Sequence, residues 1–287
     1  MDRFLFVGSC FAENIGRRFV ENQFDAVVNP YGTMYNPASV GHTVERWLLS
    51  SLECSKGNVG RNRGNYSPCG GEGGSSLPMG EGGGRGRFSV VVITLGTNHI
   101  YILKETGEIV DNCMKRPQRL FREEQLSVDE CVDYLSKAVG LLKERNPEVK
   151  VIFTVSPIRY AKYGFHGSQL SKATLLLAVD KLVSASSGEL CYFPAYEIMN
   201  DELRDYRFYQ PDMLHPSEQA VDYIYDLFAE TYFSADAKQM VREWQPIKAA
   251  LAHRPFNPDS EEHKAFLAKV SALKDAFLAK WKSSAVN

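Results

Sequence analysis

Short apolar runs and amphipathic stretches alternate along most of the chain. The runs are rich in β-branched or aromatic residues and stop at turn residues, which is typical of strands buried in a parallel sheet. Between them, apolar residues recur every three or four positions, the spacing of a helix that buries one face. The pattern predicts strands at 3–7, 26–28, 88–95, 149–155 and about 190–193, and helices at 12–21, 37–51, 127–145, 168–186, 217–232 and 259–282.

This order of elements indicates an α/β fold, in which a mainly parallel sheet carries helices on both faces. Two helix starts have clear local signals. Ser127 and Glu130 have the spacing of a capping box, and Pro37 stands at the first turn of its helix. We expect one α/β domain at residues 1–235, followed by a helical extension at residues 236–287.

The segment 57–87 breaks the alternation. It holds 12 of the 22 glycines, several arginines and almost no aliphatic side chains. Such a composition cannot bury enough apolar surface to offset the entropy of ordering, so we interpret the segment as a disordered loop that interrupts the α/β domain. A phosphate-binding loop is the functional alternative, but the segment lacks the G-x-x-x-x-G-K-[ST] motif of such loops.

The predicted C-terminal helix has a continuous apolar stripe. One interpretation is that the stripe packs on the main domain, and the other is that it forms a homodimer. Stripes of this width are ordinary core faces, which favours the first interpretation. The stripe comprises Phe266, Leu267, Val270, Leu273, Phe277, Leu278 and Trp281.

Composition and charge narrow the classes of partner. The net charge of −2 creates no overall field that favours nucleic acid or a membrane. No apolar run approaches the roughly 20 residues of a transmembrane helix, and residues 1–10 lack the features of a signal peptide. The six cysteines form no C-x-x-C pair or zinc spacing. We therefore expect a cytoplasmic protein with reduced thiols, and the early first strand leaves room for a longer natural N-terminus.

A small polar residue, Ser9, stands where the first predicted strand ends and the first helix begins. Open α/β folds place their chemistry at the carboxyl ends of strands, and the N–H groups at a helix start can bind an anion. The Ser9 hydroxyl is therefore a candidate nucleophile. Its alternative role is an N-cap, although Ala12 makes the capping box incomplete. Cys10 is either the nucleophile of a thiol enzyme or a small buried apolar residue.

Asp212 and His215 lie three positions apart, between two prolines and just before a predicted helix. An Asp so placed can accept the imidazole Nδ1–H, which leaves Nε2 free to take a proton from a serine hydroxyl. The structural alternative is a turn with a helix cap. Several other groups belong at the same edge of the sheet and are candidate donors to an oxyanion: the N–H groups of Ser9 and Gly32, and the side-chain amide of Asn98.

The remaining candidates have simpler explanations. Asn98 is alternatively a turn residue after Gly96, and the structural alternative for His99 and His166 is that they are exposed to solvent. A metal site made of His99, Asp212 and His215 is a further hypothesis. The spacing of these three residues is not that of a known ligand set, which disfavours it.

Several segments of the chain resemble the GSCFA family, a bacterial branch of the SGNH/GDSL hydrolase group. The signature appears as Gly8-Ser9-Cys10-Phe11-Ala12, and the resemblance covers most of residues 4–258. The fold of the group is a three-layer α/β/α sandwich with a parallel sheet of about five strands. The other similar segments are 29–37, 94–97, 153–159, 171–178, 196–199 and 201–209, and the last continues into Asp212 and His215.

The resemblance implies roles for these residues. Ser9 would be the nucleophile and His215 the base, with Asp212 orienting the imidazole. Gly32 and Asn98 would complete the oxyanion hole with the Ser9 N–H. The implied activity is hydrolysis of a small acyl ester, such as an O-acetylated carbohydrate, or transfer of its acyl group to a second alcohol. No metal or organic cofactor is implied.

The chain departs from the family pattern at 57–87, where family members carry a longer segment with clustered His, Trp, Ser and Phe. This departure motivates an alternative from a different class, a non-catalytic binding or interaction protein on a hydrolase fold.

Overall fold

The computed structural model describes residues 2–55, 87–113, 116–257 and 259–282. The expected disordered loop at 57–87 therefore lies outside the described residues, apart from Arg87 at its end. Within the described part of the chain, no helix is both long and apolar enough to cross a membrane.

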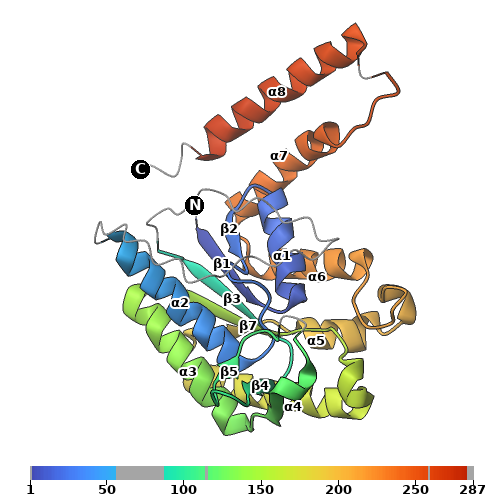
Figure 1. Ribbon diagram of the computed structural model, residues 1–287. Helices are drawn as coiled ribbons and strands as arrows, with labels where there is room; N and C mark the ends of the chain where they lie inside the picture. The colour runs from blue at the N-terminus through green and yellow to red at the C-terminus, as the bar shows by residue number, and fades with distance from the viewer. Residues whose placement is uncertain (1, 56–86, 114–115, 258, 283–287) are drawn as a thin grey trace.

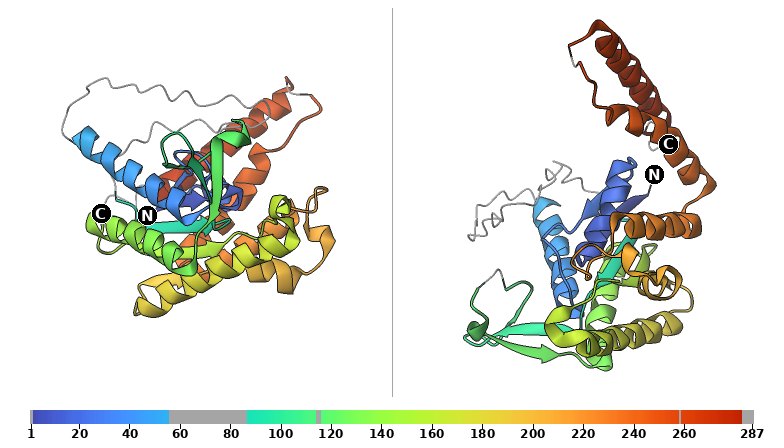
Figure 2. Two further views of the ribbon diagram at one scale, coloured as in Figure 1. Left: turned by 60° about the horizontal axis from the view of Figure 1, so that its bottom comes forward. Right: turned by 90° about the vertical axis from the view of Figure 1, so that its right-hand side faces the viewer.

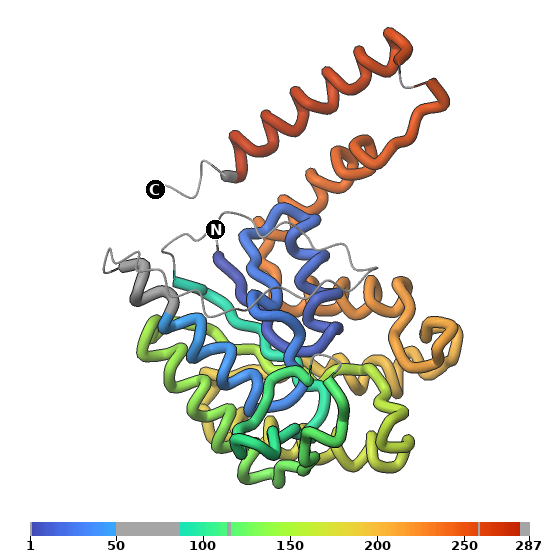
Figure 3. The backbone as a smooth tube through the Cα atoms, in the orientation of Figure 1, coloured from blue at the N-terminus to red at the C-terminus, as the bar shows by residue number. Residues whose placement is uncertain are grey.

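The centre of the molecule is a five-stranded parallel sheet with the strand order β2-β1-β3-β7-β8 (Figure 1). Although β1 is the first strand of the chain, it lies inside the sheet, as the course of the backbone from the N-terminus shows (Figure 3). Phe4 pairs with Ala26 on one side and with Val90 on the other. The five predicted strands are thus confirmed. They are β1 (Arg3–Gly8), β2 (Asp25–Val28), β3 (Val90–Leu95), β7 (Lys150–Val155) and β8 (Leu190–Tyr192).

Two apolar cores, one on each face of the sheet, make the molecule a three-layer sandwich. Leu5 and Val7 of β1 point into one core, whereas Phe4 and Phe6 point into the other. This alternation follows from the two-residue period of a strand, and it explains the uninterrupted apolar run. The first core is covered by α2 (Pro37–Ser55), α3 (Val128–Arg145) and α4 (Gly164–Ala185), and the second by α1 (Cys10–Glu21), α6 (Glu218–Tyr232) and α7 (Ala235–Leu251).

A second, antiparallel sheet, which the sequence pattern did not predict, follows β3. Its order is β5-β4-β6, and it lies at the end of the molecule away from the C-terminal helices (Figure 2). Four of the five residues of β6 are exposed, so that strand carries no apolar alternation. Its strands are β4 (His99–Leu103), β5 (Ile109–Val110) and β6 (Phe121–Gln125).

His99 is buried in this second sheet, so the alternative that it is exposed to solvent is wrong, whereas His166 is exposed. The His99 ring stacks on Tyr163 with the ring centroids 3.6 Å apart, and its Nδ1 lies 3.0 Å from Glu123. These partners are distant in the sequence, so no local signal marks the burial.

The predicted helix starts follow local chemistry. The Ser127–Glu130 capping box is present, with both reciprocal hydrogen bonds. Helix α1 begins at Cys10, two residues earlier than predicted, because Ser9 caps it. The connections contain short elements, which are η1 (Gln118–Leu120), η2 (Ala161–Tyr163), α5 (Ala195–Glu197), the π-helix η3 (Ile198–Leu203) and η4 (Tyr206–Phe208).

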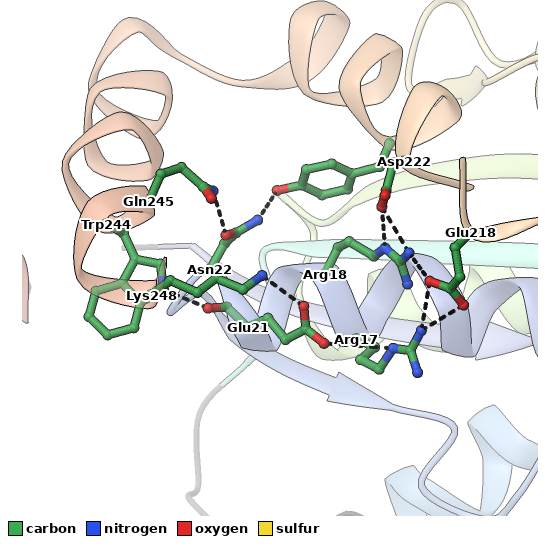
Figure 4. Close-up of polar contacts among 10 residues, drawn as sticks. Arg17, Arg18, Glu21, Asn22, Glu218, Asp222, Trp244, Gln245 and Lys248 are labelled. Atoms are coloured by element: carbon green, nitrogen blue, oxygen red, sulfur yellow. Dashed lines mark hydrogen bonds and ion pairs between the residues drawn. The ribbon is translucent and has the colours of Figure 1, made fainter. Parts of the chain in front are cut away.

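Helix α7 is held against α1 by polar contacts (Figure 4). The Trp244 indole N–H donates to the Glu21 carbonyl oxygen at 2.7 Å, and Gln245 donates to Asn22 at 3.1 Å. Nearby, the guanidinium of Arg18 pairs with Glu218 and Asp222 of α6. The C-terminal extension is therefore joined to the sandwich through α1, and also through α6, where Lys238 donates to the Glu230 carbonyl oxygen at 2.9 Å. Its division from the α/β domain at residue 235 stays a prediction.

Helix α8 (Glu261–Lys282) packs on α7 and projects from the sandwich (Figures 1 and 2). The ring of Phe277 lies 5.0 Å from that of Trp244, and the Trp281 indole donates to Glu243 at 2.9 Å. Leu273 of the predicted stripe is 59% exposed. Part of the stripe thus packs on the neighbouring helix, and the homodimer through this helix stays a prediction.

Candidate active site

Ser9 occupies the junction between β1 and α1, as the sequence predicted. Its N–H donates to the Thr94 carbonyl oxygen at 3.1 Å, and its Oγ accepts from the Phe11 N–H at 3.3 Å. The side chain is fully buried in this conformation. The junction needs glycine before it, because Gly8 has a φ of +145° and a Cβ there would lie 2.1 Å from the Thr94 oxygen. The close approach of β1 to β3 therefore sets where Ser9 stands.

The loop after β2 is fastened to the same strand end. The Gly8 N–H donates to the Asn29 side chain at 2.9 Å, and the Met34 N–H donates to the Gly8 carbonyl oxygen at 2.9 Å. Gly32 lies in this loop with a φ of +91°, and its N–H donates to the Asn29 carbonyl oxygen at 2.8 Å. The loop thus reaches the Ser9 junction, with the Gly32 N–H engaged in its own turn.

Asn98 follows the end of β3, but its side chain is turned toward the second sheet. Its amide nitrogen donates to the Leu126 carbonyl oxygen at 2.7 Å, and its backbone N–H donates to Ser171 at 2.9 Å. All three predicted oxyanion donors, Ser9, Gly32 and Asn98, therefore already donate within the protein. Asn98 keeps a second amide hydrogen. The oxyanion hole stays a prediction that requires these groups to be released or redirected.

Asp212 and His215 form the expected pair. The imidazole Nδ1 lies 2.5 Å from Asp212 Oδ2, while Asp212 Oδ1 accepts the backbone N–H groups of Leu214 and His215. These backbone hydrogen bonds, followed by the imidazole, lower the pKa of Asp212 to about 2. Both side chains are more than 40% exposed. A carboxylate that stays ionised and orients the imidazole through Nδ1 leaves Nε2 as the free ring nitrogen.

The loop that carries His215 is tied to the segment after β7. The Arg159 backbone N–H donates to the Leu214 carbonyl oxygen at 3.1 Å, and its guanidinium donates to the Met213 carbonyl oxygen at 3.0 Å. Strand β7 pairs with β3, which pairs with β1. Ser9 and the His215 loop are thus both attached to the carboxyl edge of the sheet. Within the described part of the chain, no hydrogen bond joins Ser9 to His215, so their catalytic pairing stays a prediction.

Cys10 is poorly suited to be the nucleophile. Burial raises the pKa of its thiol to about 11, so the thiol is neutral near pH 7, whereas a thiolate is the reactive form. Cys10, Cys113, Cys131 and Cys191 are free cysteines, and the expectation of reduced thiols throughout the chain stays a prediction.

The sequence interpretation missed Lys172, the most unusual residue at this edge. Its side chain is 1% exposed, and its Nζ donates to the carbonyl oxygens of Gly96 at 2.7 Å and Ser156 at 2.6 Å. Burial lowers its pKa to about 7. A signal was present in the sequence, because Lys172 lies three and seven positions before Leu175 and Val179 and so falls on the buried face of α4.

The structure gives no support to a metal site made of His99, Asp212 and His215. His99 pairs with Glu123 in the second sheet, whereas Asp212 and His215 pair with each other. Among the described residues, no group of three or more His, Cys, Asp or Glu side chains is placed to hold a metal ion.

Two cavities lie at different ends of the sheet. A cavity of about 280 Å³ lies beside the amino end of β1, where Phe4, Phe24 and Trp281 line it. A small one of about 30 Å³ lies beside Arg159 and Lys172. The larger cavity is therefore at the edge opposite Ser9.

Comparison with solved structures finds several esterases and lipases. An acetyl esterase mutant with acetate ion is 11% identical, with a TM-score of 0.41 over 85% of this chain and 99% of that one. A carbohydrate esterase of family 3 from Talaromyces cellulolyticus is 10% identical, with a TM-score of 0.41 over 85% and 99%. A GDSL-like lipase from Bacteroides thetaiotaomicron VPI-5482 is 13% identical, with a TM-score of 0.43 over 80% and 87%.

Among curated protein sequences, none matches the chain significantly. The profile of the GSCFA family matches residues 3–68 and 86–228, and the profile of the GSCFA domain protein C-terminal domain matches residues 244–286. The gap in the first match falls inside the glycine-rich segment. Because the first match spans well over half of the chain and includes Ser9, Asp212 and His215, the chain belongs to the GSCFA family.

Proposed function

We propose that this protein is a serine-dependent acyl-ester hydrolase or acyltransferase of the SGNH type, with Ser9 as its nucleophile. The observation that carries the proposal is the Asp212–His215 pair, whose imidazole is oriented by an ionised carboxylate. The loop of this pair is tied to the same sheet edge on which Ser9 stands. Membership of the GSCFA family supports the same assignment.

The chemistry follows from the roles of the three side chains. Ser9 Oγ attacks the ester carbonyl carbon while His215 Nε2 accepts the serine proton. The imidazolium that forms is stabilised by Asp212, and it returns the proton to the departing alcohol. Water or a second alcohol then attacks the acyl carbon, and the same imidazole accepts its proton. The bond between the acyl carbon and Ser9 Oγ breaks, the imidazolium returns the proton to Oγ, and the acid or the new ester leaves. The sequence of steps needs no metal or organic cofactor.

Reaction requires the Ser9 hydroxyl to leave its capping position. In the structure Oγ accepts from the Phe11 N–H at 3.3 Å. Loss of such an N-cap bond typically costs about 1 kcal/mol, which substrate binding can offset. Rotation about the Ser9 Cα–Cβ bond would then free the hydroxyl for His215. We propose that the Ser9 and Gly32 N–H groups and the Asn98 amide stabilise the oxyanion only after this local rearrangement.

The substrate we propose is a small acyl ester. An O-acetylated carbohydrate is one member of this class. An acetyl ester is therefore the first substrate for assays.

A serine-directed fluorophosphonate probe tests the proposal. The wild-type protein should be labelled, and Ser9→Ala should lose the label. Cys10→Ala is a matched control, because it removes the neighbouring nucleophilic atom and should keep the label. If the wild type fails to react while a known serine esterase reacts alongside it, the proposal is wrong. Equal labelling of Ser9→Ala would show that another residue is the nucleophile.

The alternative function is ligand binding without catalysis. It is favoured by one observation, the full burial of Ser9 together with the engagement of its N–H by Thr94. Binding of an acetyl ester without turnover, unchanged in His215→Ala, would support this alternative. Loss of turnover in His215→Ala with retained binding would exclude it.

A further inference from the structure

Lys172 is a buried lysine whose Nζ has no carboxylate as a hydrogen-bond partner among the described residues. It lies on α4, and its two hydrogen bonds go to main-chain oxygens at the ends of two neighbouring strands, β3 and β7. The titratable groups that face it are the Cys10 thiol and the phenols of Tyr160 and Tyr196, whose ring centroids lie 5.1 and 5.8 Å from Nζ. Burial raises the pKa of all three groups, so they are neutral near pH 7. Burying a lysine in this way is costly, which indicates a specific role.

The first bond of Lys172 leads to the serine. Its acceptor, Gly96, donates its N–H to the Tyr35 carbonyl oxygen at 2.8 Å, and the Thr97 N–H donates to the same oxygen at 2.8 Å. Met34, the residue before Tyr35, donates to the Gly8 carbonyl oxygen at 2.9 Å. Gly96 therefore holds the loop that is fastened to the strand end immediately before Ser9.

The second bond leads to the histidine. Its acceptor, Ser156, is fully buried, and its Oγ accepts the Ile158 N–H at 3.4 Å. The next residue, Arg159, holds the carbonyl oxygens of Met213 and Leu214 through its guanidinium and its N–H. Ser156 therefore begins the segment that carries the loop of Asp212 and His215.

We propose that Lys172 is a positioning residue that ties the segment carrying Ser9 to the segment carrying His215. A single ammonium group can hold both carbonyl oxygens at once because it has three N–H donors on a flexible stem. The inference rests on the proposed function, because only a serine–histidine reaction requires these two segments to keep a set separation. A misplacement of about 1 Å between reacting groups costs roughly 100-fold in rate.

The test compares Lys172→Met with Lys181→Met. Methionine fills a similar volume without N–H donors, and it leaves the carbonyl oxygens of Gly96 and Ser156 without the hydrogen bonds from Lys172. Lys181 lies on the same helix but is 60% exposed and pairs with the exposed Asp129. On p-nitrophenyl acetate we expect Lys172→Met to lower kcat by about 100-fold with KM within about threefold. Lys181→Met should change neither constant.

Rescue by a conservative variant separates positioning from general packing. Lys172→Gln keeps two N–H donors on a shorter, neutral side chain. We expect the kcat of Lys172→Gln to be about tenfold higher than that of Lys172→Met, since glutamine can hold at least one carbonyl oxygen. Equal kcat values for the Gln and Met variants would contradict the role of the two hydrogen bonds. The Gln variant also keeps the inference testable if the Met variant does not fold.

Amide hydrogen exchange tests the tie without any need for turnover. The reporters are the N–H groups of Gly96, Thr97 and Arg159, which hold the two segments together. Compared with the wild type, these N–H groups should exchange about tenfold faster in Lys172→Met and at the same rate in Lys181→Met. Unchanged exchange in a folded Lys172→Met variant would overturn the inference, as would faster exchange with wild-type kcat. Faster exchange in a protein that never labels with the serine probe would support the tie and reject the proposed function.

Discussion

The imidazole Nδ1 of His215 lies 2.5 Å from Oδ2 of Asp212, within a loop in which the same carboxylate accepts two backbone N–H groups. The pair therefore makes its hydrogen bonds locally, within four consecutive residues. Its position over the sheet edge depends on Arg159, whose contacts with Met213 and Leu214 tie the loop to the end of β7. The Asp212–His215 hydrogen bond and the Arg159 contacts that anchor the loop can therefore be removed separately by mutation.

Removal of the orienting charge should impair catalysis strongly. Asp212→Asn keeps an acceptor for the backbone N–H groups but no longer favours the imidazole tautomer that accepts the serine proton. We expect kcat to fall by about 1,000- to 10,000-fold. Asp205→Asn is a matched control, because Asp205 also accepts a backbone N–H, that of Arg207 at 2.8 Å. Comparable rate losses in the two variants would argue against the role of Asp212.

The pH profile of kcat should show no inflection caused by ionisation of Asp212 above about pH 4. The pKa of Asp212 is lowered from 3.8 to about 2, first by the backbone N–H groups of His215 and Leu214. The stabilisation of the folded state by this carboxylate is therefore present above its unfolded pKa of 3.8 and is lost as pH falls through about 2. A kcat profile from pH 4 to 8, compared with that of Asp212→Asn, provides the measurement. A fall of the wild-type kcat near pH 5 that is absent from the profile of Asp212→Asn would contradict this prediction.

The glycine before Ser9 should be intolerant of a side chain. In Gly8→Ala the Cβ would meet the Thr94 oxygen at 2.1 Å, at a φ of +145°. We expect a loss of at least about 2 kcal/mol in the free energy of unfolding, measured with urea. Gly140→Ala is the control, because a Cβ there meets nothing within 4 Å on helix α3. It should stabilise the protein by up to about 1 kcal/mol.

Loosening the histidine loop should slow acylation without unfolding the protein. Arg159→Met removes the guanidinium bond to the Met213 oxygen but keeps the backbone bond to Leu214. We expect labelling by the fluorophosphonate probe to slow by about tenfold, with less than about 1 kcal/mol lost in unfolding free energy. Arg207→Met serves as the control, because Arg207 lies close by but is 71% exposed and pairs with Asp205. Equal labelling rates for wild type and Arg159→Met would show that the anchor does not matter.

Lys172 should make stability depend on pH in a definite direction. Burial lowers its pKa from 10.5 to about 7, so between these values the unfolded chain binds a proton that the folded chain lacks. Stability due to this group therefore rises with pH, by about 2 to 3 kcal/mol between pH 6 and 9. Urea unfolding of wild type and Lys172→Met at both pH values isolates the contribution. A constant difference between the two proteins would mean that the lysine keeps an ordinary pKa.

The C-terminal helix offers a test of the two interpretations of its apolar stripe. Phe277 is buried against Trp244, so Phe277→Ala should lower the stability of α8 by about 3 kcal/mol, as measured by hydrogen exchange. Leu273 is exposed, so Leu273→Ala should change stability by less than about 0.5 kcal/mol. If Leu273→Ala instead converts a dimer to a monomer in light scattering, the exposed part of the stripe is a dimer interface.

Local patterns were sufficient for much of this protein. The apolar runs predicted all five strands of the parallel sheet. The signal is clearest for β1, β3 and β7, because strands buried on both faces leave a continuous apolar run. The Ser127–Glu130 box and the Asp212–His215 pair were also predictable, because each is completed within four consecutive residues. The place of Ser9 at a strand end followed from the order of elements.

Contacts between distant segments settled the rest. Strand β6 pairs its mostly exposed residues with β4, and His99 is buried by Tyr163, more than 60 positions away. The partners of Lys172 lie 76 and 16 positions away, and the Asn98 amide is occupied by Leu126. None of these follows from periodicity or capping. A hydrogen-bond partner is chosen by which segments the folded chain brings together, and that depends on packing across the whole sheet.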